Sequence, residues 1–285
     1  MRRTTLCLIA SRPHQWIKNL VVFAAPLAAG DIQEKEVLTG TIAAAFLFLF
    51  ISISVYFFND LRDIDIDRKH PKKSQRPIAN SDIPSRLAFG IAFIFAAVPL
   101  TISFFISSSL GICLASYVFI NILYSLKLKE IPYLELGLVS SGFVFRSAAG
   151  GLASDIPLSF WFISLVSCAS LFVVVGKRYS ELSTYQTYFS RPVLRFYPLS
   201  TLRALLFISA TLAVVTYSFW LGRSENTWGV FSLLSLIIFI LTILRYNHRL
   251  QQGSGEDPVQ TLLSDFWLVS LSSLWALSYG VAVYG

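Results

Sequence analysis

Apolar stretches of about 18 to 22 residues recur along this chain, and they constrain its fold more than any other feature. A stretch of this length can cross the roughly 30 Å hydrocarbon core of a bilayer as one helix. We predict about nine spans, near residues 15–30, 37–58, 86–105, 108–126, 131–150, 157–176, 200–221, 228–246 and 264–284. The expected fold class is all-α, a polytopic transmembrane helical bundle.

The composition leaves no room for a separate soluble domain. Hydrophobic residues make up 55% of the 285 positions and charged residues only 14%. We therefore expect a single integral-membrane domain over residues 1–285. The net charge of +7 does not indicate nucleic-acid binding, because the basic residues lie between apolar spans and form no continuous patch.

The positions of Lys and Arg predict the orientation. Twenty of the twenty-three lie on one side of the predicted spans, and the exceptions are Lys35, Arg146 and Arg223. Because positively charged loops are retained in the cytoplasm, we expect a multi-pass protein of the cell membrane with a cytoplasmic N-terminus. The two long polar connections, 59–85 and 177–199, then lie on the cytoplasmic side.

The second predicted span ends in an acidic cluster. Four carboxylates lie within eight residues, at Asp60, Asp63, Asp65 and Asp67. If the helix continues to just before Pro71, then Asn59, Asp63 and Asp67 recur at four-residue intervals, with Asp60 on the same side. Like charges at this spacing repel and require a countercharge.

A divalent cation would supply that countercharge. The donors are hard oxygens, which favour magnesium or manganese over zinc, and magnesium usually binds one or two carboxylates together with substrate phosphates. The basic residues that follow, including Lys72, Lys73 and Arg76, could bind the remaining phosphate charge. The alternative is a solvated juxtamembrane helix, whose acids pair with its own Arg62, Arg68 and Lys69.

The acidic segment resembles a known motif. Asn59-x-x-x-Asp63-x-x-x-Asp67, followed by Pro71, Lys72 and Arg76-Pro77, is similar to the first Asp-rich motif of the UbiA superfamily of intramembrane prenyltransferases. Four further segments, 12–19, 124–129, 145–151 and 176–182, resemble its branch of polyprenyl-phosphate phosphoribosyltransferases. That branch makes decaprenylphosphoryl-5-phosphoribose. Because the five segments are spread over most of the chain, the resemblance implies a UbiA-like bundle.

The chain departs from the wider superfamily at one place. A second Asp-rich motif, which follows the sixth span there, is replaced by Lys177, Arg178, Tyr179 and Glu181. The resemblance to the branch implies transfer of 5-phosphoribose from 5-phosphoribosyl 1-pyrophosphate to a polyprenyl (decaprenyl) phosphate, with release of diphosphate. It also implies Mg²⁺ and a role in arabinan or other cell-envelope glycan synthesis, with another phosphoribose-derived modification as the alternative. The sequence leaves a homo-oligomer open.

The resemblance and the charge pattern together give a set of expected site residues. Asp60, Asp63 and Asp67 are the expected catalytic residues, and with Asn59 they are the expected metal ligands. The expected substrate-binding residues are Asn59, Lys18, Lys72, Lys73, Arg76, Tyr124, Lys127, Lys129, Arg146, Lys177, Arg178 and Glu181. For any one of the lysines or Arg178, membrane anchoring at the cytoplasmic surface is the competing interpretation.

Arg146 differs from the other cations because it lies inside a span. A charged residue there is costly and usually faces a cavity or a partner. It could instead extend to the outer interface, while the small residues 147–151 after it suit close helix packing or a cavity wall.

Two other functions stay open. A UbiA-type prenyltransferase would move an isoprenoid from its diphosphate to a small aromatic acceptor with the same first motif, and the missing second acidic pair argues against it. A transporter or lipid-binding protein could use the acidic helix as a cation site, but inverted broken helices are not evident in the sequence.

Overall fold

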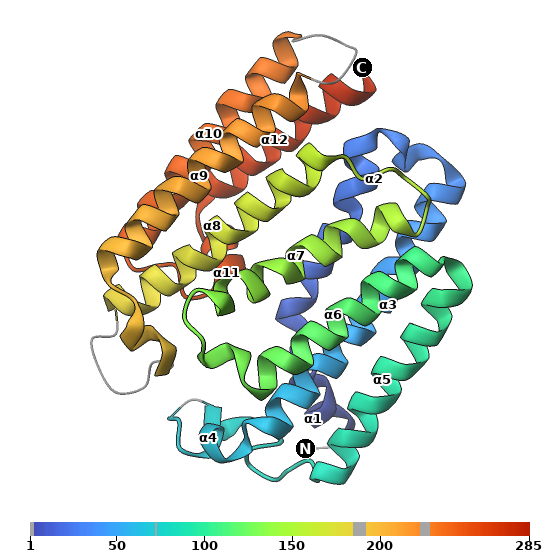
Figure 1. The fold of residues 1–285 in the computed structure, drawn as a ribbon, viewed down its shortest axis with the longest axis vertical. Coiled ribbons are helices and arrows are strands. Elements are labelled where there is room, and N and C mark those ends of the chain that lie inside the picture. Colours follow the sequence, from blue (N-terminus) through green and yellow to red (C-terminus); the bar gives the residue numbers. More distant parts are fainter. Residues whose placement is uncertain (1–2, 72, 185–191, 223–228) are drawn as a thin grey trace. The chain divides into compact units, whose positions relative to one another are not determined.

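A computed structural model describes residues 3–71, 73–184, 192–222 and 229–285, and these residues form helices and turns without a strand (Figure 1). The helices are α1 Arg3–Ala10, α2 Ala24–Ala29, α3 Lys35–Arg62, α4 Ile64–Arg68, α5 Ser85–Ile106, α6 Ser108–Leu126, α7 Leu134–Leu152, α8 Phe160–Thr184, α9 Leu199–Leu221, α10 Val230–Gln251, α11 Pro258–Ser264 and α12 Phe266–Tyr284. Five 3-10 helices lie between them: η1 Pro13–Phe23, η2 Asp31–Gln33, η3 Lys73–Gln75, η4 Leu128–Glu130 and η5 Pro192–Phe196.

Helix forms at all nine predicted spans. In the described part of the chain, seven helices are long and apolar enough to cross a membrane: α3, α5, α6, α8, α9, α10 and α12. The predicted span at 15–30 is instead η1 followed by α2, and the one at 131–150 is α7, which carries Glu135 and Arg146. The all-α transmembrane fold is confirmed, with two helical segments that fall short of a full apolar span.

The spanning helices present large apolar side chains on their outer surfaces. Phe105 on α5 is 86% exposed and Phe207 on α9 is 74% exposed. In water such surfaces would be costly, whereas in hydrocarbon they need no cover. This chain is therefore an integral membrane protein.

The chain divides into two compact units. Unit 1 comprises residues 1–27, 31–129 and 145–157, and α3, α5 and α6 pack together within it (Figure 1). Its apolar core brings Ile53 and Phe57 of α3 against Ala88 and Ala92 of α5. The small alanines allow close approach, and the Ser54 hydroxyl donates a hydrogen bond of 2.6 Å to the Ala92 carbonyl.

Unit 2 comprises residues 28–30, 130–144 and 158–285. Within it α8 packs on α9, and α10 packs on α12. One buried cluster centres on Tyr217, whose hydroxyl donates to the Ser235 hydroxyl at 2.9 Å and accepts from the Trp275 indole at 3.0 Å. The expected single domain over 1–285 stays a prediction.

Close packing in unit 1 depends on one glycine of α7. A β-carbon added to Gly150 would lie 2.0 Å from the carbonyl oxygen of Val22 in η1, far inside van der Waals contact. The obstacle is backbone, which cannot rotate away as a side chain can. Gly150 is thus the residue that lets α7 approach η1, as the small residues around it predicted.

We expect Gly150→Ala to lower the stability of the purified protein by about 1 to 3 kcal/mol, because the new methyl group overpacks a backbone contact. The matched control is Gly137→Ala on the same helix, where an added β-carbon would meet nothing within 4 Å. Helix propensity predicts that the control is neutral or more stable by up to about 1 kcal/mol. Thermal unfolding in detergent compares the two variants, and equal midpoints would contradict the packing argument.

Candidate active site

The acidic segment is not one continuous helix. α3 ends at Arg62, Asp63 has φ −100° and ψ 11°, and α4 resumes at Ile64. The predicted helix to just before Pro71 is therefore wrong, although the Asp63 amide still donates to the Asn59 carbonyl at 3.0 Å and the Asp67 amide to the Asp63 carbonyl at 2.7 Å. The turn at Asp63 changes which acidic side chains meet.

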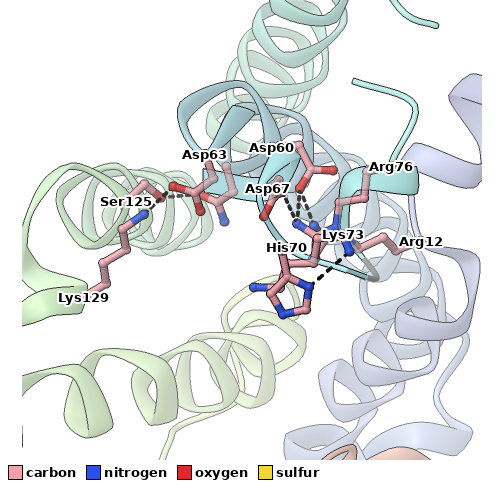
Figure 2. Close-up of polar contacts among 10 residues, drawn as sticks. Arg12, Asp60, Asp63, Asp67, His70, Lys73, Arg76, Ser125 and Lys129 are labelled. Carbon is pink, nitrogen blue, oxygen red and sulfur yellow. Dashed lines mark hydrogen bonds and ion pairs between the residues drawn. The ribbon is translucent and has the colours of Figure 1, made fainter. Parts of the chain in front are cut away.

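Asp60 and Asp67, seven residues apart, converge on one arginine (Figure 2). The Arg76 Nη1 donates to Asp60 Oδ1 at 3.0 Å and to Asp67 Oδ2 at 2.6 Å. The two acidic side chains are only 4% and 2% exposed, and the Arg12 guanidinium also donates to Asp60. Buried carboxylates are costly unless they are paired, and here two guanidinium groups compensate them.

Arg12 is a site residue that the sequence interpretation missed. Its backbone has φ 55° and ψ 65°, in the left-handed region, directly before Pro13. For a residue other than glycine, this backbone conformation costs roughly 1–3 kcal/mol, and it persists only where other contacts stabilise it. Those contacts are the Asp60 carboxylate and the Tyr56 ring, whose centroid lies 5.0 Å from the guanidinium carbon. In the sequence, the signals were an Arg-Pro pair before an apolar run and the resemblance of segment 12–19 to the phosphoribosyltransferase branch.

Asn59 and Asp63 face the end of α6 instead. The Lys129 Nζ lies 2.5 Å from Asp63 Oδ1, and the Ser125 hydroxyl donates to Asn59 Oδ1 (Figure 2). The expectation that Lys129 approaches the acidic segment is met in this structure. The predicted set of four acidic and amide groups is thereby split into one pair on Arg76 and two groups on α6 and η4.

The other residues of unit 1 that were predicted to bind substrate lie on different elements and differ in exposure. Lys73 begins η3 beside His70, whose Nδ1 accepts from the Lys73 amide at 3.3 Å (Figure 2), while Lys72 lies outside the described residues. Lys127 is exposed after α6, Tyr124 is half-buried on α6, and Lys18 is half-buried on η1. Their roles in substrate binding stay predictions.

Arg68 makes two hydrogen bonds within the protein. Its Nε donates to the Ala79 carbonyl at 2.9 Å, and its Nη2 donates to the Ser81 hydroxyl at 2.9 Å. These bonds tie α4 to the connection that follows η3. They thereby help to fix the place of Arg76 beside the two buried acids.

The donor chemistry fits magnesium at one place. Across the described residues, no three acidic, imidazole or thiol side chains gather closely enough to form a metal cluster by themselves. Magnesium, however, commonly uses one or two protein carboxylates and completes its shell with water and substrate phosphate. Asp60 and Asp67 already bracket a positive nitrogen, so this pair could accept a divalent cation in its place.

Arg146 lies deep within unit 1 and does not extend to an interface. It is 6% exposed, and its Nε donates to Asn19 Oδ1 at 3.0 Å. Its Nη2 donates to the Ser52 hydroxyl at 3.0 Å and to the Tyr117 hydroxyl at 2.9 Å, and the Phe48 ring lies 5.1 Å from the guanidinium carbon. These contacts join α7 to η1, α3 and α6, and they stabilise the helices that carry the acidic residues.

Unit 2 contains a second group of predicted residues, at the end of α8. Arg178 donates from Nε and Nη2 to the two oxygens of Glu135 at 2.7 and 2.8 Å, and from Nη1 to Glu181 at 2.8 Å. Arg178 and Glu135 are 2% and 0% exposed, and Lys177 lies 3.9 Å from Glu181. Arg178 thus has an internal partner, and its expected role as a phosphate ligand remains a prediction.

Glu135 was not predicted as part of any site. The Tyr197 hydroxyl donates to it at 3.3 Å and accepts from the Tyr133 amide at 2.8 Å. Burial raises the pKa of Tyr197 to about 12, so this phenol stays a neutral donor at physiological pH. The available signal was an acidic residue at the start of the least apolar span, but its arginine is 43 residues away in the chain.

We expect Glu135→Gln to cost roughly 3 kcal/mol or more of stability, because the neutral amide leaves the buried Arg178 charge poorly compensated. Thermal unfolding of the purified protein measures this change. The control is Glu130→Gln, an exposed position in η4, which should change stability by about 0.5 kcal/mol at most. If both variants unfold like the parent protein, the Glu135–Arg178 pair is not structural.

Sequence comparison finds close relatives over nearly the whole chain. The profile of the UbiA prenyltransferase family matches residues 20–274. A decaprenyl-phosphate phosphoribosyltransferase of Mycolicibacterium smegmatis is 37% identical over 290 residues, which cover 96% of this chain and 91% of that protein. The enzyme of the same name from Mycobacterium tuberculosis is 35% identical over 280 residues, with 96% and 93% covered.

Solved structures agree in fold. A UbiA homologue from Archaeoglobus fulgidus bound to DMAPP and Mg²⁺ superposes with a TM-score of 0.76 at 18% identity, and the match covers 98% of each chain. A digeranylgeranylglyceryl phosphate synthase gives a TM-score of 0.69 at 15% identity, covering 100% of this chain and 99% of that one. At these identities the likeness concerns the fold alone.

Proposed function

Because this chain belongs to the UbiA prenyltransferase family, we propose that it transfers 5-phosphoribose from 5-phosphoribosyl 1-pyrophosphate to a polyprenyl phosphate, releasing diphosphate. The observation that carries this proposal is the end-to-end similarity to relatives named decaprenyl-phosphate phosphoribosyltransferase, at 37% and 35% identity. The cluster around Asp60, Asp67 and Arg76 supports it, because it combines two buried acids with a cation near the end of the membrane-spanning helix α3.

The reaction is a substitution at ribose C1. An oxygen of the lipid phosphate forms the new bond to C1 while the bond from C1 to the diphosphate oxygen breaks. The acceptor phosphate is already anionic at neutral pH, so the protein need not remove a proton to create the nucleophile.

The acids would hold the cation, and the basic residues would hold phosphate. Asp60 and Asp67 would bind Mg²⁺, which when bound neutralises the leaving diphosphate. Arg76 and Arg12, which contact these acids, would then donate to phosphate oxygens, because guanidinium groups bind phosphate with two parallel hydrogen bonds. Lys129 would do the same beside Asp63.

Charge balance favours an activated ribose over a lipid diphosphate as the donor. Phosphoribosyl pyrophosphate carries a diphosphate and a separate 5-phosphate, and the acceptor adds a third phosphate group. Such a load needs more cations than one metal supplies. In unit 1, Arg12, Arg76 and Lys129 lie beside the acidic residues and would supply these further cations.

The competing function is transfer of an isoprenoid from its diphosphate to a small acceptor. It is supported by membership of a family whose name describes prenyl transfer. Against it stands the ion pair that Arg178 makes with Glu135, in place of two free carboxylates. The two functions require different donors, so one assay distinguishes them.

We also propose that the acidic cluster lies at the cytoplasmic face, with the N-terminus on the same side. Twenty of the twenty-three Lys and Arg residues lie on that side of the predicted spans, which supports this orientation. Both proposed substrates are compatible with it, because phosphoribosyl pyrophosphate is a charged, water-soluble metabolite and polyprenyl phosphate reaches the site from the bilayer. A homo-oligomer remains compatible with every contact described.

We expect membranes that contain the protein to move ribose label from phosphoribosyl pyrophosphate into extractable lipid when polyprenyl phosphate and Mg²⁺ are present. Addition of EDTA should abolish the transfer, and excess Mg²⁺ should restore it. A parallel reaction supplies prenyl diphosphate and a labelled aromatic acceptor. Label that stays aqueous in the first reaction and enters lipid in the second would replace our proposal with the competing one.

We expect Asp67→Asn to reduce the rate of transfer by about 10² to 10³, because it removes a charge at the proposed metal. Asp65→Asn is the control on the same short helix. The Asp65 side chain is 93% exposed, and its ion pair with Arg68 is long, at 3.9 Å. The control should keep the parent rate. Both variants are checked for membrane insertion and thermal stability, and an active Asp67→Asn enzyme would contradict the placement of the metal.

A further inference from the structure

A groove with a volume of about 800 Å³ runs along three helices of unit 2. α9 and α10 form its sides, and Phe172 and Tyr179 of α8, both nearly buried, lie at its base. Its rim includes Phe207, 74% exposed, and Leu244, 58% exposed. Because these residues belong to membrane-spanning helices, the groove opens toward the hydrocarbon of the bilayer.

The groove is polar at one end and apolar along the rest. Its polar lining consists mainly of Arg203 at the start of α9, and Asn247 and Gln251 at the end of α10. From there, apolar side chains continue as far as Val215 on α9 and Ile240 on α10. No Asp or Glu is among the described residues that line it. This arrangement matches an amphiphile with an anionic head and an apolar chain.

The length of the groove matches one leaflet. On α9 the lining runs from Arg203 to Val215, which at 1.5 Å per residue is about 18 Å. Half of the roughly 30 Å hydrocarbon core is about 15 Å, so the groove extends from the membrane interface to near the bilayer centre. An acyl chain of a phospholipid fits this span, whereas a decaprenyl chain is much longer than the groove.

The charge at the polar end is available to an anion. The Arg203 Nε donates to the Tyr179 hydroxyl at 3.4 Å, and its guanidinium carbon lies 5.9 Å from the centroid of that ring. In the part of the chain that the structure describes, no carboxylate lies within ion-pair distance of Arg203. The phenol orients the guanidinium and leaves its charge uncompensated, as a phosphate site requires.

We propose that this groove binds an anionic phospholipid, with its phosphate on Arg203 and one acyl chain between α9 and α10. The site is separate from the acidic cluster of unit 1, and the proposal does not depend on the proposed transferase activity. The lipid would fill a gap between two helices that otherwise lies open. Its headgroup would sit at the same membrane interface as Arg203, where anionic lipids attract basic residues.

Native mass spectrometry of the detergent-purified full-length protein, titrated with phosphatidylglycerol or phosphatidylcholine, tests the proposal. We expect phosphatidylglycerol to bind about tenfold more tightly, since the guanidinium–phosphate contact favours the lipid of net negative charge. Arg203→Gln should remove this preference. Thr211→Trp, which places a large side chain in the groove, should weaken the binding of both lipids.

Two matched variants serve as controls. Arg86→Gln removes another exposed cation, at the start of α5, and Ile208→Trp introduces the same tryptophan on α9 at a position that does not line the groove. Both should bind phosphatidylglycerol like the parent protein. Equal binding of the two lipids, or an unchanged preference in Arg203→Gln, would overturn the proposal. So would displacement of phosphatidylglycerol by equimolar polyprenyl phosphate in an Arg203-dependent way, which would assign the groove to an isoprenoid phosphate.

Discussion

The need to compensate buried charge governs this protein more than any other constraint. A bundle of membrane-spanning helices cannot hold a carboxylate or a guanidinium in its interior without a partner, because desolvation costs several kcal/mol per ion. Asp60 and Asp67 meet this requirement through Arg76 and Arg12, and Arg178 meets it through Glu135. The residues proposed to act in the reaction and the residues that stabilise each unit are therefore partly the same.

Asp60 and Asp67 are both the partners of Arg76 and the proposed ligands of the metal. The nitrogen of Arg76 occupies the place between Asp60 and Asp67 that a divalent cation would need. In the proposed mechanism, a metal that binds with a phosphorylated ligand would take the place of the arginine between the acids, and the arginine would contact phosphate. The buried acids would then have a cation beside them throughout this exchange.

Local sequence patterns predicted the helices well, and long-range pairs poorly. Runs of apolar residues placed α3, α5 and α6 closely, because span length and hydropathy are properties of neighbouring residues. The break at Asp63 has neither Gly nor Pro to mark it, so the four-residue spacing suggested the wrong grouping of acids. Glu135 pairs with an arginine 43 residues away, and Arg12 with an aspartate 48 residues away, which no local period reveals.

The pairing of Glu135 with Arg178 also limits how this protein can change during evolution. A substitution at either position alone leaves the other charge buried, so most single steps pass through a poorly folded intermediate. A lineage could acquire an acidic residue at position 178 only if position 135 changed at nearly the same time. The chemistry available at the end of α8 is thus held in place by a residue of α7, and divergence toward a second acidic motif would require two coordinated substitutions.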